Sequence, residues 1–156
     1  MRLTHFTDYS LRVLIYLASV PERRATIGEI ATAFGVSKNH LMKVVQFLGG
    51  IGLLSTVRGK GGGLGLARDP GQIGIGDVVR QAEGAALPAE CFDKASNTCP
   101  ITRLCALQAA LREASEAFHR VLDGYTLQDL VQNRRSLAKV LFIGKARPTA
   151  RSAAHA

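Results

Sequence analysis

The three cysteines of the chain lie within one short segment, CFDKASNTCPITRLC, which spans residues 91–105. Seven residues separate Cys91 from Cys99, and five separate Cys99 from Cys105. The close Cys-x2-Cys pair that is typical of zinc sites and redox dithiols does not occur. Wider spacing lets a loop surround a larger group, and such thiolates suit an iron–sulfur cluster. Three ligands are one too few for a closed four-ligand site, so the fourth comes from elsewhere or is absent; buried or incidental thiols are the alternative.

Length and composition favour one domain, or a small domain with an extended appendage. The chain has 156 residues, and 47% of them are hydrophobic, which is enough for a core. No run of about 18 apolar residues occurs, which argues against a membrane span. The first residues lack a signal cleavage site, and Leu11, Leu14 and Ile15 recur there at helical spacing. We expect a cytoplasmic protein without a membrane partner, whose cysteines are thiols or metal ligands rather than disulfides.

Positive charge is concentrated in the first half of the chain, whose overall net charge is +8. Residues 1–80 carry ten Lys and Arg against five Asp and Glu, whereas residues 81–143 carry seven of each kind. This asymmetry indicates a polyanionic partner on one side of the molecule. An excess of Arg that only increases solubility is the alternative, and charge alone does not decide between them.

The pattern of residues 1–80 predicts a mainly α-helical, winged helix-turn-helix domain. A helix is expected over residues 5–19, after an N-cap at Thr4. In the next helix, Thr26 and Glu29 form a capping-box pattern, and Gly35 is placed for the turn that follows. The apolar positions that would wedge two helices at a steep angle are Ile30, Phe34, Val36, Leu41 and Val44.

The third helix, within VSKNHLMKVVQFLGG, is expected to be the recognition helix of this motif, with Ser37 as its N-cap. The first residues of such a helix face base edges in the major groove of double-stranded DNA. The polar residues able to reach bases or phosphates are Ser37, Lys38, Asn39, His40 and Lys43. An ordinary helical hairpin with a solvated polar face is the alternative.

A predicted β-hairpin with a basic, glycine-rich turn follows the recognition helix directly. Residues 53–57 and 64–67 are expected to be its strands, and RGKGGG its turn. Arg58 and Lys60 at the tip can contact phosphates, because glycines let the backbone approach closely. A hairpin in this place is typical of a winged helix. The Gly-Lys-Ser/Thr ending of a phosphate-binding loop is missing, which argues against an ATPase.

From Leu104 onward, heptad spacing of apolar residues predicts a long helix with a seam for a partner helix. The two registers are Leu104, Leu111 and Phe118, and Leu107, Ala114 and Val121. Packing of this stripe within the chain is the alternative. We expect a homodimer, whose two-fold symmetry would place two recognition helices on a palindromic operator. Thr126, with Asp129 three residues on, then caps a short helix.

The expected organisation therefore has four parts. Residues 1–80 form the DNA-binding domain, residues 81–106 the cysteine-bearing loop, and residues 104–143 the dimerisation helix with a short C-terminal helix. Residues 144–156 are expected to be a disordered basic tail.

Several motifs together resemble the winged-helix family of iron–sulfur transcription regulators that includes nitric-oxide-sensing repressors. They are MRLTHFTDYSLRVLIYLA, GVSKNHLMKVV, VRGKGGG, GDVVR, the three cysteines and YTLQDLV, and the resemblance covers nearly all of residues 1–143. The resemblance implies a homodimer with one [4Fe-4S] cluster per subunit, a [2Fe-2S] cluster being the alternative. It implies that Cys91, Cys99 and Cys105 are ligands, and that a carboxylate from the first helix of the other subunit, Asp8 here, completes the set.

Two positions distinguish this chain from other members of that family. Some members have a histidine ligand shortly after the third cysteine, where this chain has Ala106, Leu107 and Gln108. Iron-responsive members lack the acid at the position of Asp8. Similar proteins also often carry a basic residue in the wing where this chain has Gly65, so that wing contacts are expected to rest on Arg58 and Lys60.

The predicted function is that of a transcriptional repressor, not an enzyme. Nitric oxide would attack or remove the cluster and thereby release operator DNA. An iron- or redox-responsive regulator of the same fold is the first alternative, and an adaptor with incidental cysteines is another. A thiol enzyme or electron carrier is disfavoured, because His119 is the only histidine within reach of the cysteines and is expected to lie on the dimer helix.

Overall fold

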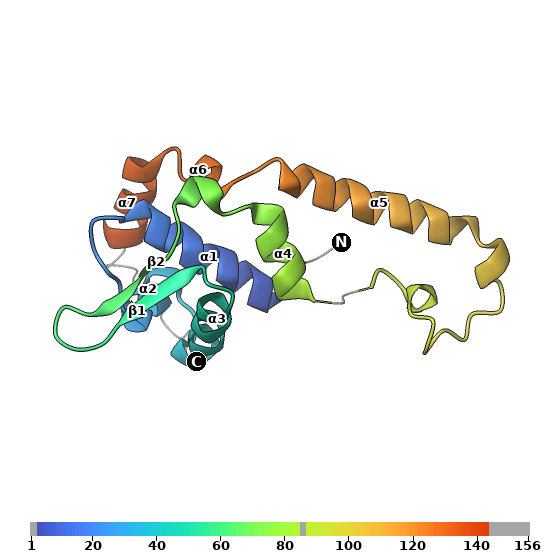
Figure 1. Cartoon of the computed structure of the whole chain (residues 1–156), viewed down its shortest axis with the longest axis horizontal. Helices are drawn as coiled ribbons and strands as arrows, with labels where there is room; N and C mark the ends of the chain where they lie inside the picture. The colour runs from blue at the N-terminus through green and yellow to red at the C-terminus, as the bar shows by residue number, and fades with distance from the viewer. Residues whose placement is uncertain (1–2, 85–86, 144–156) are drawn as a thin grey trace, which may run out of the picture.

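A computed structural model describes residues 3–84 and 87–143 of the chain. Its two strands form one antiparallel hairpin, and its other regular elements are helices (Figure 1). In chain order they are α1 (His5–Ser19), α2 (Ile27–Phe34), α3 (Lys38–Gly50), β1 (Leu54–Val57), β2 (Gly63–Leu66), α4 (Ile75–Glu83), α5 (Ala106–Asp123), α6 (Leu127–Leu130) and α7 (Arg134–Ile143). The expected mainly α-helical winged helix-turn-helix with a long C-terminal helix is confirmed.

Local capping signals set the limits of the first helices as the sequence predicts. The Thr4 hydroxyl accepts a hydrogen bond from the Thr7 N–H at 3.2 Å, at the start of α1. Thr26 and Glu29 form the predicted capping box of α2, with bonds of 2.7 and 3.2 Å. Gly35 ends α2 in the left-handed conformation, at a φ of 65°, which glycine adopts without steric cost. Ser37 occupies the N-cap position of α3 without a side-chain capping bond.

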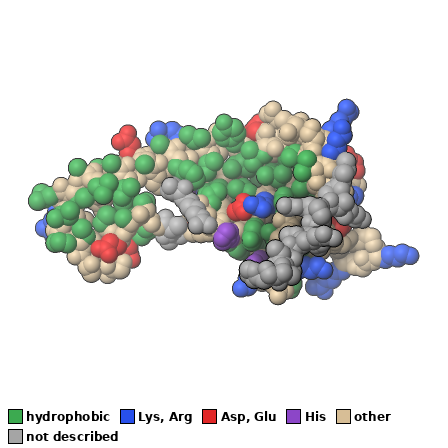
Figure 2. Space-filling view, turned by 180° about the vertical axis from the view of Figure 1, so that it is seen from behind, with side chains coloured by type: hydrophobic (Ala, Val, Ile, Leu, Met, Phe, Trp, Pro, Cys, Tyr) green, Lys and Arg blue, Asp and Glu red, His purple; other side chains and the backbone are tan. Residues whose placement is uncertain are grey.

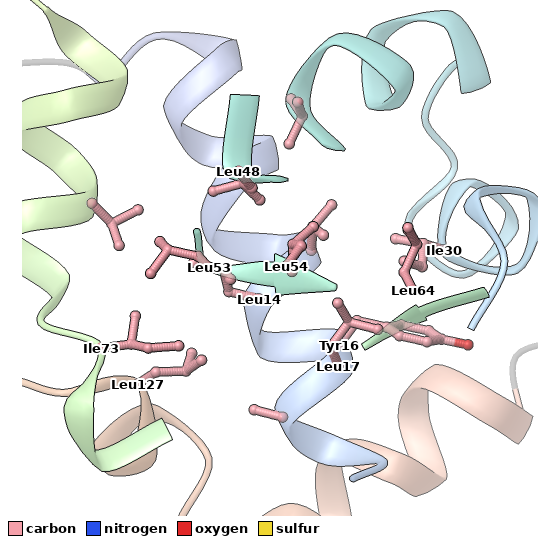
Figure 3. Close-up of a cluster of buried hydrophobic side chains, with 14 of the residues drawn as sticks. Leu14, Tyr16, Leu17, Ile30, Leu48, Leu53, Leu54, Leu64, Ile73 and Leu127 are labelled. Carbon is pink, nitrogen blue, oxygen red and sulfur yellow. The ribbon is translucent and has the colours of Figure 1, made fainter. Parts of the chain in front are cut away.

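The hydrophobic core forms around α1, which lies at the centre of the winged domain (Figures 1 and 3). Leu14 and Leu17 of this helix are almost fully buried, as is the Tyr16 side chain. Their neighbours in the core come from several surrounding elements: Ile30, Leu48, Leu53, Leu54, Leu64, Ile73 and Leu127. The predicted wedge residues Ile30, Leu41 and Val44 are buried as well, and Phe34 and Val36 pack against the same core.

The wing is a short hairpin anchored by its apolar residues. Leu54 pairs with Leu66 and Val57 with Gly63, so each strand lies within one residue of its predicted limits. Leu64 is buried, and a bridge between Leu64 and Ala25 joins the hairpin to the segment before α2. A Cβ at Gly62 would meet the Val57 carbonyl oxygen, so the tight turn requires a residue without a side chain.

The C-terminal end of α5 is fixed to α4 by an ion pair and by apolar packing. Arg80 of α4 contacts Asp77 at 2.8 Å and Asp123 of α5 at 2.7 Å. The Arg80 guanidinium holds the pKa of Asp123 below its ordinary value. Phe118 of the predicted heptad seam and Leu122, which lies outside the seam, pack against the core, whereas Val121 of the seam is 63% exposed.

Helix α7 is not predicted from the sequence, yet it covers part of α1 and α2. The Phe142 ring meets Tyr16 edge-on, with ring centroids 5.1 Å apart, and the Arg23 guanidinium lies 5.2 Å from the centroid of Phe142. The predicted short helix after Thr126 is confirmed as α6, with its capping box. The tail expected at residues 144–156 lies outside the described residues.

None of the helices within residues 3–84 and 87–143 has both the length and the apolar character that crossing a membrane requires.

Substitution Gly76→Ala tests the junction between α4 and α5. A Cβ at Gly76 would collide with the Asp123 carboxylate and lie 3.1 Å from the Asp123 backbone nitrogen. Overpacking of this kind is expected to lower the free energy of unfolding by about 1–3 kcal/mol. Urea denaturation followed by circular dichroism measures the change.

The matched control for this substitution is Gly49→Ala in α3, where nothing lies within 4 Å of the added carbon. Alanine is favoured over glycine in a helix by roughly 0.5–1 kcal/mol, so this variant should be at least as stable as the original chain. A Gly76→Ala variant as stable as the control would contradict the close contact with Asp123.

Candidate functional site

The residues predicted to contact DNA all lie on the surface of the winged domain. On α3, the exposed side opposite the buried Leu41, Val44 and Leu48 carries polar residues. The predicted residues of this helix and its N-cap, all exposed, are Ser37, Lys38, Asn39, His40 and Lys43. Arg58 and Lys60 are exposed in the turn of the wing, and β1 packs against α3. Helix α3 and the wing therefore pack together, and both expose positively charged side chains to solvent.

His40 differs from the other predicted DNA-contacting residues because its ring is held against α1. It stacks on Tyr9, with ring centroids 6.2 Å apart and an angle of 24° between the planes. Tyr9 in turn stacks on His5 at 5.9 Å. The recognition helix is thus linked through aromatic rings to the first turns of α1.

Arg24 is a candidate wing residue that the sequence does not single out. Its Nη1 donates to the Ser55 carbonyl oxygen, the Ser55 hydroxyl and the Gly63 carbonyl oxygen, each at 3.3 Å. The same nitrogen lies 3.5 Å from where a Cβ of Gly65 would be. Arg24 therefore places a positive charge over Gly65 in the second strand of the wing. Only the folded contact between the segment before α2 and the hairpin brings it there.

The cysteine-bearing segment is held by bonds between side chains and backbone. Cys91 lies in a short 3-10 turn, Cys105 directly precedes α5, and Cys99 lies between them. Gln108 Nε2 of α5 donates to the Cys91 carbonyl oxygen at 2.7 Å, and the Asn97 side-chain oxygen accepts from the Cys99 N–H at 3.0 Å. All three thiols are free and half-buried.

The chemistry of these donors fits a soft metal or a cluster, but the described residues of one chain do not assemble a site. Within residues 3–84 and 87–143, no three Cys, His, Asp or Glu side chains come close enough together to hold a metal ion. Free thiols are the ligands that iron–sulfur clusters take, and three of them occur on one segment. Closing a site around Cys91, Cys99 and Cys105 therefore requires the segment to tighten and a further donor to arrive.

The candidate for that donor, Asp8, lies in the first turn of α1 and is bound by Arg12. Arg12 Nη2 contacts Asp8 Oδ2 at 2.8 Å, and Arg12 Nε donates to Asp8 Oδ1 at 3.0 Å. The Asp8 side chain is 38% exposed, so a second subunit can reach it. The Arg12 guanidinium also lies 5.9 Å from the centroid of Tyr9 and 5.8 Å from that of Phe34 in α2.

The start of α1 is also fastened to the end of α4. The backbone N–H of Thr4 donates to Glu83 Oε1 at 2.7 Å, and the Thr4 hydroxyl donates to the same oxygen at 3.1 Å. Burial raises the pKa of Glu83, but hydrogen bonds from Thr7 and Thr4 outweigh burial and hold the pKa below its ordinary value. Asp8 is therefore presented from a well-fixed helix end.

Exposed apolar side chains gather around the cysteines and the first half of α5. Leu104 is 92% exposed, and Ile101, Leu107 and Leu87 are also largely exposed, whereas the exposed Val121 lies near the other end of α5. Figure 2 shows a broad hydrophobic surface over the half of the molecule that holds this segment, while most Lys and Arg side chains in the view lie around the other half. A hollow of about 490 Å³ beside Cys105 runs along α5 to Arg112 and Glu116.

The family model and the relatives that match this chain are all described as transcriptional regulators. The family model Rrf2, described as an iron-dependent transcriptional regulator, matches residues 3–133. The HTH-type transcriptional regulator NsrR of Bacillus subtilis (strain 168) is 49% identical over 142 residues, which cover 90% of this chain and 97% of that relative. The HTH-type transcriptional regulator NsrR of Geobacillus kaustophilus (strain HTA426) is 48% identical with the same coverage.

Solved structures show the same fold. The structure of CymR (YrzC), the global cysteine regulator of B. subtilis, is 30% identical and matches with a TM-score of 0.66 over 85% of this chain and 98% of that one. T. potens IscR, at 23% identity, matches with a TM-score of 0.68 over 95% and 94% of the two chains.

Substitution Lys60→Ala tests the contribution of the wing tip to DNA binding. Each lost phosphate contact should flatten the plot of log affinity against log salt concentration by roughly one unit, and affinity should fall about equally for all sequences. Asn39→Ala should instead reduce the preference for one sequence over another. Fluorescence anisotropy with labelled duplexes over a salt series measures both.

Lys94→Ala is the matched control, because this exposed lysine lies in the cysteine-bearing segment, away from the wing. It should leave the salt slope unchanged. The same slope for the original chain and the Lys60→Ala variant would remove Lys60 from the interface.

Proposed function

The chain belongs to the Rrf2 family of transcriptional regulators, and we propose that it is a homodimeric repressor that releases operator DNA when nitric oxide attacks its iron–sulfur cluster. The observation that carries this proposal is the presence of three free, half-buried thiols in the segment that leads into α5, together with an Asp8 carboxylate on α1 that is 38% exposed. The high identity to relatives named NsrR supports it. DNA binding by the chain follows from the family and from the winged helix.

The dimer rests on the exposed half of α5. Leu107 remains exposed on it and Leu104 just before it, whereas Phe118 packs inside the chain. An apolar stripe of this kind on a helix end that projects from its domain fits a second copy of the same helix. Two-fold symmetry would then present two α3 helices to the two halves of a palindromic operator.

The cluster ligands in this proposal are Cys91, Cys99 and Cys105 of one subunit and Asp8 of the other. A bound cluster supplies iron, to which nitric oxide binds strongly with displacement of protein ligands. The carboxylate is the weakest and most replaceable of the four donors. We take the cluster to be of the [4Fe-4S] type, as the resemblance to the family implies.

The contacts of Asp8 supply a physical route from the ligand to the recognition helix. When a second subunit draws the Asp8 carboxylate toward itself, the ion pair and the hydrogen bond between Asp8 and Arg12 weaken. Arg12 then shifts relative to Tyr9 and Phe34, and the Tyr9 ring carries the stacked ring of His40 on α3. Loading or losing the cluster therefore changes the packing between α1 and α3 without unfolding either helix.

An iron- or redox-responsive iron–sulfur regulator of the same fold is the second candidate, which the description of the family favours. A thiol enzyme is a poorer fit. His119 lies fourteen residues beyond Cys105 on α5, about 21 Å along the helix, next to Asp123. A general base must reach within hydrogen-bond distance of the thiol that it activates.

Unequal roles of the ligands are the first prediction from this proposal. Cys91→Ala, Cys99→Ala and Cys105→Ala should each lose the visible absorbance of the cluster, because two thiolates and a carboxylate hold iron poorly. Asp8→Ala should retain the absorbance after anaerobic purification, since water or a small thiol can fill the vacant position, but it should bleach faster in air. The measurement is absorbance over time before and after exposure to air.

Glu22→Ala, which removes an exposed carboxylate beyond the other end of α1, is the matched control and should bleach like the original chain. Full absorbance in the Cys99→Ala variant would show that the ligand set is wrong.

Coupling of the cluster to DNA affinity is the second prediction. Stoichiometric nitric oxide should weaken operator binding by the loaded dimer about tenfold or more, which is ~1.4 kcal/mol at minimum. The far-ultraviolet circular dichroism should change little, because the winged domains keep their cores. An anaerobic gel shift with and without nitric oxide measures the affinities.

The variant with all three cysteines replaced by Ala should bind weakly and should not respond to nitric oxide. Equal affinities for the loaded protein, the treated protein and this variant would leave a DNA-binding dimer and refute the sensing mechanism.

A further inference from the structure

The outward side of the recognition helix contains one apolar residue among its polar ones. Asn39, Lys43 and Gln46 are exposed at helical spacing and lie opposite the buried side of α3. Met42 lies next to them and is 57% exposed. Single exposed apolar residues are common on protein surfaces. Met42 is notable because of what surrounds it.

Met42 lies in a shallow hollow of about 550 Å³ between α2 and α3. The six residues that line the hollow are Ile27, Asn39, Met42, Lys43, Val45 and Gln46. Ile27 is the first residue of α2, and both Ile27 and Val45 pack against the core from this side. Three apolar side chains therefore line the hollow, together with two amides and one ammonium group.

Charge and hydrogen-bonding groups around the hollow favour DNA as its occupant. No acid lines it, Lys43 lies beside Met42, and the exposed Lys38 begins the same helix. Amide side chains such as those of Asn39 and Gln46 can read base edges. In the major groove, the apolar group that a base pair presents is the C5-methyl group of thymine. An apolar hollow within a polar, basic surface matches that group.

We propose that Met42, with Ile27 and Val45 behind it, receives a thymine methyl group and so determines specificity at one base pair of each half-site. This inference rests on the proposed binding of the chain to DNA through α3, but not on the cluster or on nitric oxide. A methionine suits the role, because its flexible thioether adapts its shape to a small apolar group and makes no competing hydrogen bond.

Replacement of thymine by deoxyuridine tests the proposal, because it removes the methyl group and leaves the base-pairing atoms in place. A tight-binding duplex is first selected from random sequences with the full-length, cluster-loaded protein. Each thymine of one half-site is then replaced in turn, and dissociation constants are measured by anisotropy. Burial of one methyl group predicts that one replacement weakens binding about fourfold (~0.8 kcal/mol).

Three variants assign this effect to a residue. Met42→Ala should bind the thymine and deoxyuridine duplexes equally at that position, and Met42→Leu should preserve most of the difference. Gln46→Ala, in the same hollow, should bind more weakly but retain the full thymine preference. It is the matched control, because it changes a neighbouring polar contact and leaves the apolar side chains intact.

The outcomes separate this inference from the proposed function. Should the protein select a duplex yet bind all deoxyuridine versions as tightly, or should Met42→Ala keep the thymine preference, the role of Met42 is refuted while DNA binding stands. Failure to select any duplex would refute DNA recognition through α3 and this inference with it.

Discussion

The burial of α1 is the constraint on which the rest of the structure depends. Helices α2, α3, α4, α6 and α7 and strand β2 all pack against it. Two serines can enter this core because their hydroxyl groups donate to carbonyl oxygens one turn earlier, Ser10 to Phe6 at 2.8 Å and Ser19 to Ile15 at 2.7 Å. Because so many elements share one helix, its first turn, where Asp8 lies, is connected to the recognition helix through Arg12, Tyr9 and His40. Interiors packed at high density transmit displacements.

The parts of the fold that local chemistry determines could be predicted from the sequence. Thr4, Thr26 and Gly35 mark helix limits because capping and left-handed turns involve only neighbouring residues. Helix α7 depends instead on distant contacts, chiefly that of Phe142 with Tyr16, which no local pattern contains. Arg24 illustrates the same limit, because its place over the wing arises only when the hairpin folds back onto the segment before α2.

The candidate sites differ in how completely one chain forms them. The surface predicted to contact DNA is already assembled, since α3 and β1 pack together and their polar residues face solvent. The spacing of the cysteines identified a candidate ligand segment but not its geometry. Residues 91–105 contain no strand pairing, so backbone turns and side-chain bonds such as that of Gln108 to Cys91 determine their path. In the proposed homodimer, contacts between the subunits set the position of Asp8 relative to the cysteines, and no pattern along one chain contains such contacts.

The attachment of α5 at one end only makes this helix a lever arm. Its eighteen residues extend about 27 Å, and its fixed end is the junction of Arg80 and Gly76 with Asp123. A rotation of about 5° at that pivot would move the end that bears Cys105 by roughly 2 Å, given the length of the helix. A small displacement of the thiols therefore corresponds to a small rotation of α5 relative to α4. Helix α4 is itself fastened to the start of α1 through Glu83. Removing one turn of α5 would shorten this arm, so that the same rotation at α4 would move the end that bears Cys105 by a smaller distance. Every side chain of the winged domain would stay in place.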